Sequence, residues 1–249
     1  MLELDGESLK SSASGSMANL GPFLQGALME EIDPAYAERL HGCAFNPYSQ
    51  YCVLDKDTGK LLWRISALND EAADRILTPL SKKDSVSLRA KGVDFEVVKR
   101  STESVSMKSL TDLISGGRSR LSVRFVTPTA FKSGGAYVII PSPRLIAQNL
   151  LMHYSQVFSG SNDVDAETLE YLEKHLMVSS YRLRSSNFGN VAKGGRGVPG
   201  FEGSLTLAAT GPDMVGGLMA MLLKFGEYAG VGIKTAMGMG AVSCRDAKQ

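Results

Sequence analysis

One order of secondary-structure patterns occurs twice in this chain of 249 residues, and it limits the possible folds more than any other feature. Alternating apolar residues indicate strands, and an apolar period of 3.6 residues indicates helices. In the first half these patterns predict a short strand, a helical stretch, two strands, a helix and two more strands, at residues 1–5, 18–40, 48–55, 60–66, 69–80, 86–89 and 93–100. Pro34 should break the helical stretch, because the residue before a proline disfavours helix.

The second half follows the same order with one additional helix. It predicts strands at 120–126, 177–186, 204–209 and 240–244, and helices at 143–157, 165–175 and 212–228. The segment after its first strand is rich in proline and glycine and is expected to be a connection. Both halves therefore predict β-α-β-β-α-β, the plan of a ferredoxin-like fold. We expect an α+β protein with two tandem ferredoxin-like domains, residues 1–117 and 118–249, joined at Ser115-Gly116-Gly117.

Composition and cysteine content indicate an ordinary folded protein. Hydrophobic residues make up 43% and charged residues 21% of the chain, which excludes disorder, collagen and coiled coil. The three cysteines lack the spacing of a disulfide framework or a zinc site, so reduced thiols are expected. The N-terminus lacks the basic and apolar regions of a secretory signal, and the apolar stretch 214–225 is too short to cross a bilayer. We therefore expect a cytoplasmic protein that does not enter a membrane.

Charge is distributed unevenly along the chain. Residues 1–117 have a net charge of −4 and residues 118–249 a net charge of +5, which together give the overall +1. Two basic stretches that lie mainly in the second half, 113–162 and 174–201, contain no Asp or Glu. Phosphate contacts release counterions and nearby carboxylates oppose them, so such stretches suit a surface for nucleic acid. A solvated surface that lacks Asp and Glu by chance is the alternative.

Residues 229–240 form the most distinctive segment, AGVGIKTAMGMG. It is not a Walker A motif, because Ile233 separates Gly232 from Lys234, and Thr235 stands where a dinucleotide fingerprint has its third glycine. A glycine-rich loop lets the backbone approach a ligand and expose N–H groups, and Lys234 supplies a cation that could face an anion. Tight packing between the last helix and the last strand is the alternative, and composition does not decide between the two.

This loop, near the end of a chain with a doubled ferredoxin-like plan, resembles the signature of the repeat-associated RAMP superfamily. Within it, the chain is similar to the CRISPR-associated endoribonucleases that cut precursor CRISPR RNA within its repeats. Three further segments fit the resemblance: Leu40-His41 with 46–49, 125–132, and 200–203. The resemblance extends from about residue 20 to residue 244. It implies a nuclease that binds CRISPR repeat RNA, as precursor and as mature guide RNA, without a cofactor and with a CRISPR effector complex as a further expected partner.

RNA carries its own nucleophile, and this decides which side chains the expected reaction needs. The 2′-hydroxyl attacks the adjacent phosphate and leaves a 2′,3′-cyclic phosphate and a 5′-hydroxyl, so the protein has to align the reactants and move protons. Imidazole suits proton transfer because its pKa of about 6.5 lies close to working pH. A two-metal nuclease needs clustered carboxylates, which the basic stretches lack. We therefore expect cleavage without a metal ion.

Three histidines could supply the imidazole. His153 lies in an apolar mid-helix setting, where packing is the simpler interpretation. His175 lies at a helix end, where its charged form would suit the helix dipole. His41 precedes Gly42 at a junction where a side chain can face a cleft. The resemblance also implies that His41 is the catalytic histidine, as general acid or base.

The residues that assist the catalytic histidine in the resembled family are only partly matched in this sequence. Some members have a tyrosine in the first helix and a lysine soon after the histidine, but helix 22–31 has no tyrosine and Asn46 stands near the lysine position. Tyr36 and Tyr48 are the nearby phenols that could donate to the phosphate. An ordinary half-buried position is the alternative for both.

RNA binding is expected mainly from cations and glycines of the second half. Arg182 and Arg184 alternate along one strand and so leave the same face, while 193–197 is expected to be the tip of a long hairpin loop. The full set of candidates is Lys132, Arg144, Arg182, Arg184, Lys193, Arg196, Gly230, Gly232, Lys234, Thr235 and Gly238. Because no aromatic pair stands out, recognition of an RNA stem by shape and phosphates is expected rather than base stacking.

Two other functions remain open on the sequence. One is a non-catalytic RNA-binding subunit of the same superfamily, which would hold guide RNA within an effector complex. The other is a nucleotide-binding enzyme that uses the glycine-rich loop.

Overall fold

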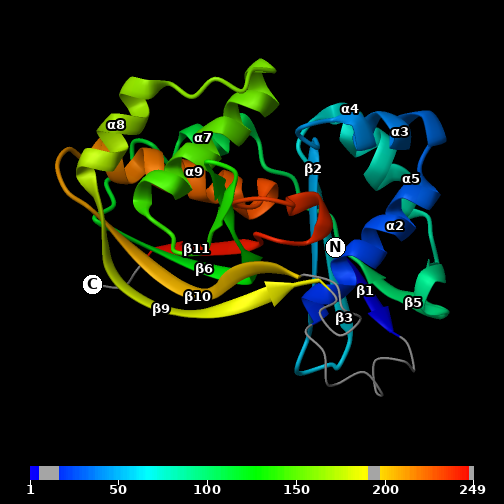
Figure 1. The fold of residues 1–249 in the computed structure, drawn as a ribbon. Helices are drawn as coiled ribbons and strands as arrows, with labels where there is room; N and C mark the ends of the chain where they lie inside the picture. The colour runs from blue at the N-terminus through cyan, green and yellow to red at the C-terminus, as the bar shows by residue number, and fades with distance from the viewer. Residues whose placement is uncertain (6–16, 190–196, 247–249) are drawn as a thin grey trace. The chain divides into compact units, whose positions relative to one another are not determined.

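The computed structural model describes residues 1–5, 17–189 and 197–246. Contacts divide the chain into two compact units, which Figure 1 shows as ribbons. The first unit contains Met1–Glu103, Gly189–Arg196 and Lys234–Gly238, and the second contains Ser104–Phe188, Gly197–Ile233 and Met239–Gln249. Neither unit is continuous in sequence, because part of the glycine-rich segment belongs to the first.

A five-stranded antiparallel sheet forms the first unit, in the order β2-β3-β1-β5-β4. Its strands are β1 (Leu2–Asp5), β2 (Tyr48–Leu54), β3 (Leu61–Ala67), β4 (Ser85–Leu88) and β5 (Val93–Arg100). The strands β5-β1-β3-β2 have the order of a ferredoxin-like sheet, and β4 extends it by pairing with β5. The short N-terminal strand therefore lies at the centre of this sheet.

The helical segments of the first unit are short, and some of them begin at a side-chain cap. They are η1 (Met17–Leu20), α2 (Gly21–Glu31), α3 (Pro34–Gly42), α4 (Asp70–Ala72), the π turn η2 (Ala73–Leu77), α5 (Thr78–Ser81), η3 (Arg89–Lys91) and η5 (Thr235–Met237). The Asp33 carboxylate accepts a hydrogen bond from Tyr36 N at 3.0 Å, and Pro34 occupies the first turn of α3, where no N–H is needed. The break predicted at Pro34 is therefore confirmed. Leu24 and Leu28 of α2 are fully buried in the same core as Trp63 of β3.

A four-stranded antiparallel sheet forms the second unit, in the order β11-β6-β10-β9. Its strands are β6 (Arg120–Thr129), β9 (Leu176–Phe188), β10 (Val198–Ala209) and β11 (Val242–Asp246). This is the same ferredoxin-like order as in the first unit. A separate hairpin, β7 (Phe131–Ser133) and β8 (Ala136–Val138), follows β6 directly.

The helices of the second unit cover one face of its sheet. They are α6 (Met107–Thr111), α7 (Pro143–Ser159), α8 (Ala166–His175) and α9 (Asp213–Ala229), and Figure 1 shows α7 and α9 above the sheet. Val123 and Leu205 are buried and directly opposite each other on β6 and β10. Arg124 and Ser204, the next opposite pair, are exposed. The sheet thus has an apolar face toward the helices and a polar face toward solvent.

The expected fold class is confirmed: the protein is α+β and has two ferredoxin-like sheets. Three local features differ from the expectation. The segment expected to be a connection contains the β7–β8 hairpin, the helix α6 was not predicted, and the helix predicted at 69–80 consists of α4, η2 and α5 in succession.

Contacts place the border between the units after Glu103, whereas the sequence led us to expect it at residue 117. The reason is visible in α9, where Gly216 and Gly217 lie against the main chain of Arg118 and Ile114. A Cβ atom at either glycine would overlap a carbonyl oxygen of that main chain. Residues 104–117 are thus held by the second unit.

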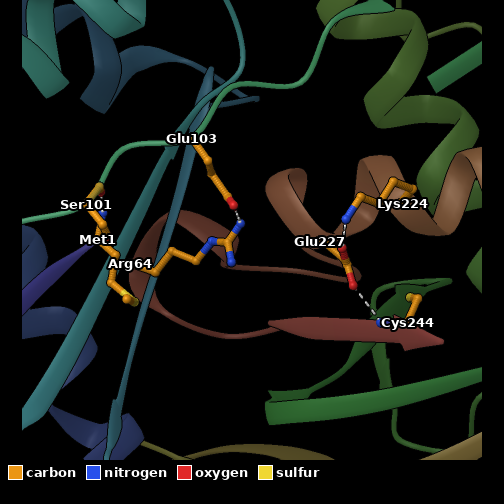
Figure 2. A network of polar contacts seen from close by, with 7 residues as sticks. All are labelled: Met1, Arg64, Ser101, Glu103, Lys224, Glu227 and Cys244. Atoms are coloured by element: carbon orange, nitrogen blue, oxygen red, sulfur yellow. Dashed lines mark hydrogen bonds and ion pairs between the residues drawn. The ribbon is translucent and has the colours of Figure 1, made fainter. Parts of the chain in front are cut away.

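Polar contacts hold the N-terminus of the chain within the first unit (Figure 2). The Met1 ammonium donates a hydrogen bond to Ser101 O at 2.7 Å, and Arg64 of β3 forms an ion pair with Glu103. Burial, followed by the charge of Arg64, lowers the pKa of the Met1 ammonium. These contacts fix the start of the chain beside the end of β5.

A second network lies between α9 and β11 (Figure 2). The Glu227 carboxylate accepts from Lys224 Nζ at 2.6 Å and from Cys244 N at 2.7 Å. Burial, followed by the charge of Glu227, raises the pKa of the Cys244 thiol, which therefore stays neutral and unreactive.

Among the helices in the described ranges, none is both long enough and apolar enough to cross a bilayer.

Candidate functional site

His41 lies in the last turn of α3 in the first unit, and its side chain is exposed. The same helix buries Tyr36, Ala37 and Leu40. Successive helix residues are about 100° apart, so the residue after Leu40 turns away from the buried face. The helix ends directly after His41, where Cys43 N donates to Leu40 O at 3.3 Å. The imidazole is therefore accessible to a ligand from solvent.

The other two histidines are packed within the second unit. His153 of α7 is 5% exposed, and its Nε2 lies 3.4 Å from the side-chain nitrogen of Asn149. Burial lowers the pKa of His153 to about 4, so its ring is neutral at pH 7. His175 ends α8 with its ring centroid 4.9 Å from that of Tyr171, and Gly211 lies against its ring. Of the three histidines, only His41 is exposed.

Tyr36 lies on the buried face of α3, five residues before His41. The residue is 4% exposed, and its hydroxyl has no hydrogen-bond partner of good geometry among the described residues. The guanidinium carbon of Arg39 lies 4.7 Å from the centroid of its ring, and Arg39 forms an ion pair with Glu71. Burial, followed by the charge of Glu71, raises the pKa of Tyr36. The phenol is therefore protonated, but its hydroxyl is buried, so a ligand could reach it only if the surrounding side chains moved.

Tyr48 begins β2 and is completely buried. Its hydroxyl accepts a hydrogen bond from Gln25 Nε2 at 3.2 Å. Burial raises the pKa of Tyr48 to about 12. This core position does not fit the catalytic role considered for Tyr48, because a ligand could reach the phenol only by opening the core.

Three glycines of the glycine-rich segment use their backbone N–H groups internally, although we had expected Gly230, Gly232 and Gly238 to offer them to a ligand. Gly230 N donates to Gly226 O at 2.8 Å, Gly232 N to the Asn149 side chain at 2.6 Å, and Gly238 N to Thr235 O at 3.3 Å. A Cβ atom at Gly232 would overlap Ala130 O. Gly232 therefore serves close packing, and the N–H groups of the three glycines are not free donors that could converge on a phosphate.

The tip of this segment, Lys234–Gly238, packs within the first unit. The buried side chain of Gln50 donates to Ala236 O at 3.1 Å and to Gly21 O at 2.8 Å, and it accepts from Trp63 Nε1 at 2.7 Å. Lys234 is exposed and has φ = 57°, the single positive φ of a non-glycine residue in the described ranges. Such a conformation costs of order 1 kcal/mol and persists only where the surroundings hold it. The lysine side chain thus projects from a firmly anchored turn.

Two of the expected RNA-binding arginines have carboxylate partners. Arg144 forms an ion pair with Glu173, and Arg184 pairs with Glu202 at 2.7 Å. Both glutamates lie just outside the stretches that lack acidic residues, and the fold places them beside arginines of those stretches. The Arg144–Glu173 pair is exposed and contributes roughly 0–1 kcal/mol, so a phosphate can displace its carboxylate at little cost. In the other pair Arg184 is exposed, whereas the Glu202 side chain is largely buried.

Arg182 lies on the polar face of the sheet together with Arg124, a residue that our list of candidates omitted. Ser204 of β10 stands directly opposite Arg182 of β9 on one side and Arg124 of β6 on the other, and Ser243 of β11 continues the row beyond Arg124. Alternation along the strand predicted at 120–126 could have identified Arg124, since it fills a position between buried Val123 and Phe125.

The remaining candidates lie in different parts of the chain. Lys132 is exposed on β7, and Thr235 begins η5. Lys193 and Arg196 lie outside the described residues. The first unit contains His41, Tyr36, Tyr48, Lys234, Thr235 and Gly238, and the second contains Lys132, Arg144, Arg182, Arg184, Gly230 and Gly232. Among the residues that the structure describes, no three His, Cys, Asp or Glu side chains form a group that could hold a metal ion.

Comparison with known proteins identifies the family. Residues 123–242 match the family described as CRISPR-associated endoribonuclease Cas6. A CRISPR-associated endoribonuclease Cas6 of Mycobacterium tuberculosis is 38% identical over 230 residues, which cover 91% of this chain and 72% of the relative. The chain belongs to the Cas6 family. A Cas6 endoribonuclease of Streptococcus thermophilus is 34% identical over 237 residues, which cover 92% of this chain and 93% of the relative.

The fold agrees with solved Cas6 structures. A Cas6 product complex matches with a TM-score of 0.75 and 25% identity, covering 98% of this chain and 97% of the solved one. The expected resemblance to repeat-processing endoribonucleases is therefore confirmed, and the Cas6 matches cover both ferredoxin-like units of the chain.

Proposed function

We propose that this Cas6-family chain binds CRISPR repeat RNA and cuts precursor CRISPR RNA by attack of a 2′-hydroxyl on the neighbouring phosphate. Family membership and the similarity to a Cas6 product complex support an endoribonuclease. The observation that carries the catalytic part is the exposed imidazole of His41 at the end of α3, in contrast to the packed rings of His153 and His175.

In this reaction the oxygen–phosphorus bond to the 2′-oxygen forms while the bond to the 5′-oxygen breaks. The products are a 2′,3′-cyclic phosphate and a 5′-hydroxyl. His41 takes the proton from the 2′-hydroxyl or gives one to the leaving oxygen, and either step is worth about 10²- to 10⁴-fold in rate. Lys234 supplies positive charge to the phosphate on the anchored turn described above. Arg182 and Arg124 supply positive charge along the open sheet face.

The test is the His41→Ala variant, assayed with a panel of repeat RNAs and analysed for the end groups of the products. We expect cleavage to fall by about 10²- to 10⁴-fold while the dissociation constant changes less than about twofold, since His41 moves protons and adds little binding. The wild-type reaction should persist in EDTA, and a 2′-deoxy nucleotide at the cut site should block it.

His175→Ala is the matched control, because it removes an imidazole that is packed at the end of α8. It should cleave at the wild-type rate. Full cleavage by His41→Ala would overturn the assignment of His41. Loss of cleavage in both variants would show that the assay does not isolate a catalytic imidazole.

Two expectations about the cellular setting follow from the same proposal. The chain acts in the cytoplasm and passes its mature guide RNA to a CRISPR effector complex. The similarity to CRISPR-associated endoribonucleases supports them. Co-purification of the tagged chain with guide RNA and effector subunits measures the second, and cell fractionation measures the first.

A further inference from the structure

The β7–β8 hairpin of the second unit has a short, well-defined turn. Gly134 and Gly135 connect the two strands and have φ values of 55° and 83°. Positive φ at both central residues is the requirement of a two-residue type I′ turn, which matches the twist of the flanking strands. The hairpin is therefore a compact element, and each of its side chains points to a defined face.

The two sides of this hairpin differ in character. Phe131 is 3% exposed, and its ring stacks on that of Phe201 with 6.2 Å between centroids. Lys132 and Tyr137 are directly opposite each other in the next register position, and strand alternation turns them away from Phe131. Both side chains are exposed, Tyr137 by 47%. The buried phenylalanine thus holds the hairpin and leaves a lysine–tyrosine pair toward solvent.

The surroundings of this pair favour an anionic, aromatic ligand. Ile140, two residues beyond the end of β8, is 78% exposed, so the chain presents a further large apolar side chain to solvent shortly after Tyr137. No Asp or Glu occurs from residue 113 to residue 162, and Lys132 forms no ion pair with any residue in the described ranges. An exposed ring, a further exposed apolar side chain and an unneutralised cation match a nucleotide, which offers a base for stacking and a phosphate for pairing.

The base of the hairpin adjoins the glycine-rich segment. Ala130, which separates β6 from β7, accepts a hydrogen bond from Ile233 N at 3.0 Å through its carbonyl oxygen, and Gly232 lies against the same oxygen. Lys132 is two residues farther along, which is about 7 Å of extended chain. The lysine–tyrosine pair therefore begins close to the part of the glycine-rich segment that Ala130 holds.

We infer that Lys132 and Tyr137 form a binding site for one unpaired nucleotide of the RNA, in which the ring of Tyr137 stacks on the base and Lys132 pairs with its phosphate. The inference rests on the proposed RNA-binding function. The nucleotide has to be unpaired, because bases within an A-form stem do not present their faces to a side chain. The site therefore recognises the single-stranded RNA that flanks a repeat stem, whereas the sequence alone led us to expect recognition of a stem without stacking.

The experiment compares two RNAs, a repeat stem-loop with its single-stranded flanks and the same stem-loop with blunt ends. Dissociation constants are measured in the His41→Ala background, so that binding is read separately from cleavage. Tyr137→Ala should weaken binding of the flanked RNA by about tenfold, the effect of losing one stacked base, and leave the blunt RNA within about twofold. Tyr137→Phe should bind as the parent, since it keeps the aromatic face.

Tyr181→Ala is the matched control. Tyr181 is 73% exposed on β9 and stands opposite Leu205, on the side of the strand away from Arg182. It should leave both dissociation constants unchanged. A 2-aminopurine base placed in the flank should lose its protein-dependent fluorescence change with Tyr137→Ala and keep it with Tyr137→Phe.

Three outcomes would overturn the inference. They are an unchanged affinity of Tyr137→Ala for flanked RNA, an equal loss for both RNAs, and a loss in Tyr137→Phe as large as that in Tyr137→Ala. Binding of both RNAs with no effect of Tyr137 removes this site and leaves the proposed function in place. Failure of every variant and of the parent to bind either RNA removes the proposed function as well.

Discussion

Burial determines the chemistry of single residues in this chain, and His153 shows it most directly. Its ring is 5% exposed in α7, and burial lowers its pKa to about 4, with the main chain of Gly230 acting in the opposite direction. In the unfolded chain the same group has a pKa of about 6.5. The folded protein therefore binds fewer protons than the unfolded chain between these two values.

This difference predicts a loss of stability in acid. When the pH falls below about 6.5, the unfolded chain gains a proton at His153 that the folded chain does not, so unfolding becomes easier. Between pH 7 and pH 5 the loss should be about 2 kcal/mol. Urea unfolding at both pH values measures it. His153→Gln should remove most of this loss and His175→Gln should keep it; the same slope in all three proteins would contradict the assignment.

Some site residues could be predicted from the sequence, and others could not. The position of His41 before Gly42 indicated a helix end, and the structure leaves its side chain exposed. The burial of Tyr48 depends on which face of its sheet the helices cover, which a single strand pattern does not reveal. The partner of Arg184 depends on register, since Glu202 is directly opposite on β10 but 18 residues away in sequence.

At the scale of elements, the glycine-rich segment connects α9 to β11, and one of its glycines allows close packing of the main chain. Gly232 has φ = 92° and lies against Ala130 O. Both its backbone conformation and the lack of space for a Cβ atom therefore require glycine at this position. Gly160 at the end of α7 has φ = 66° with open space around it and carries only the conformational constraint.

The two glycines therefore make a matched pair of substitutions. Gly160→Ala should lower the free energy of unfolding by about 1–2 kcal/mol, the cost of positive φ for a residue with a Cβ. Gly232→Ala should cost about 2–5 kcal/mol, because main chain has to move as well. Urea unfolding measures both. Equal costs would show that the close approach to Ala130 is not a real constraint.

Strong periodicity predicted the long elements well, and short elements were missed for definite reasons. The helices α7 and α9 and the strands of both sheets occur where apolar periods indicated them. The β7–β8 hairpin has strands of only three residues, too short for a period to emerge, although Ser133-Gly134-Gly135-Ala136 carries the turn residues of a two-residue loop. The five-residue α6 is too short for an apolar period to emerge, although Ser106 caps it by accepting a hydrogen bond from Ser109 N.

At the scale of the whole molecule, positive charge belongs to the C-terminal half of the sequence. Its net charge is +5, against −4 for residues 1–117. The doubled order of elements predicted both sheets correctly, because each half repeats one simple plan. The division into units could not be predicted with the same accuracy, because it depends on contacts between distant segments.

The charge distribution predicts a salt-dependent affinity for RNA. Arg182→Ala should reduce the slope of log K against log salt concentration by about 0.7–0.9, the effect of losing one phosphate contact. Arg75→Ala, an exposed cation of the first unit, changes the net charge equally and should leave the slope unchanged. Binding titrations between low and moderate salt measure both, and equal slopes for Arg182→Ala and the wild type would exclude Arg182 from the phosphate contacts.

The membership of Lys234–Gly238 in the first unit has a consequence for how the chain matures on the ribosome. Ala236 is part of the buried core of that unit, and its carbonyl oxygen receives a hydrogen bond from Gln50. Translation produces Gln50 long before Ala236. The first unit therefore lacks this core residue until residue 236 has been synthesised, and a fragment ending at residue 117 would never acquire it.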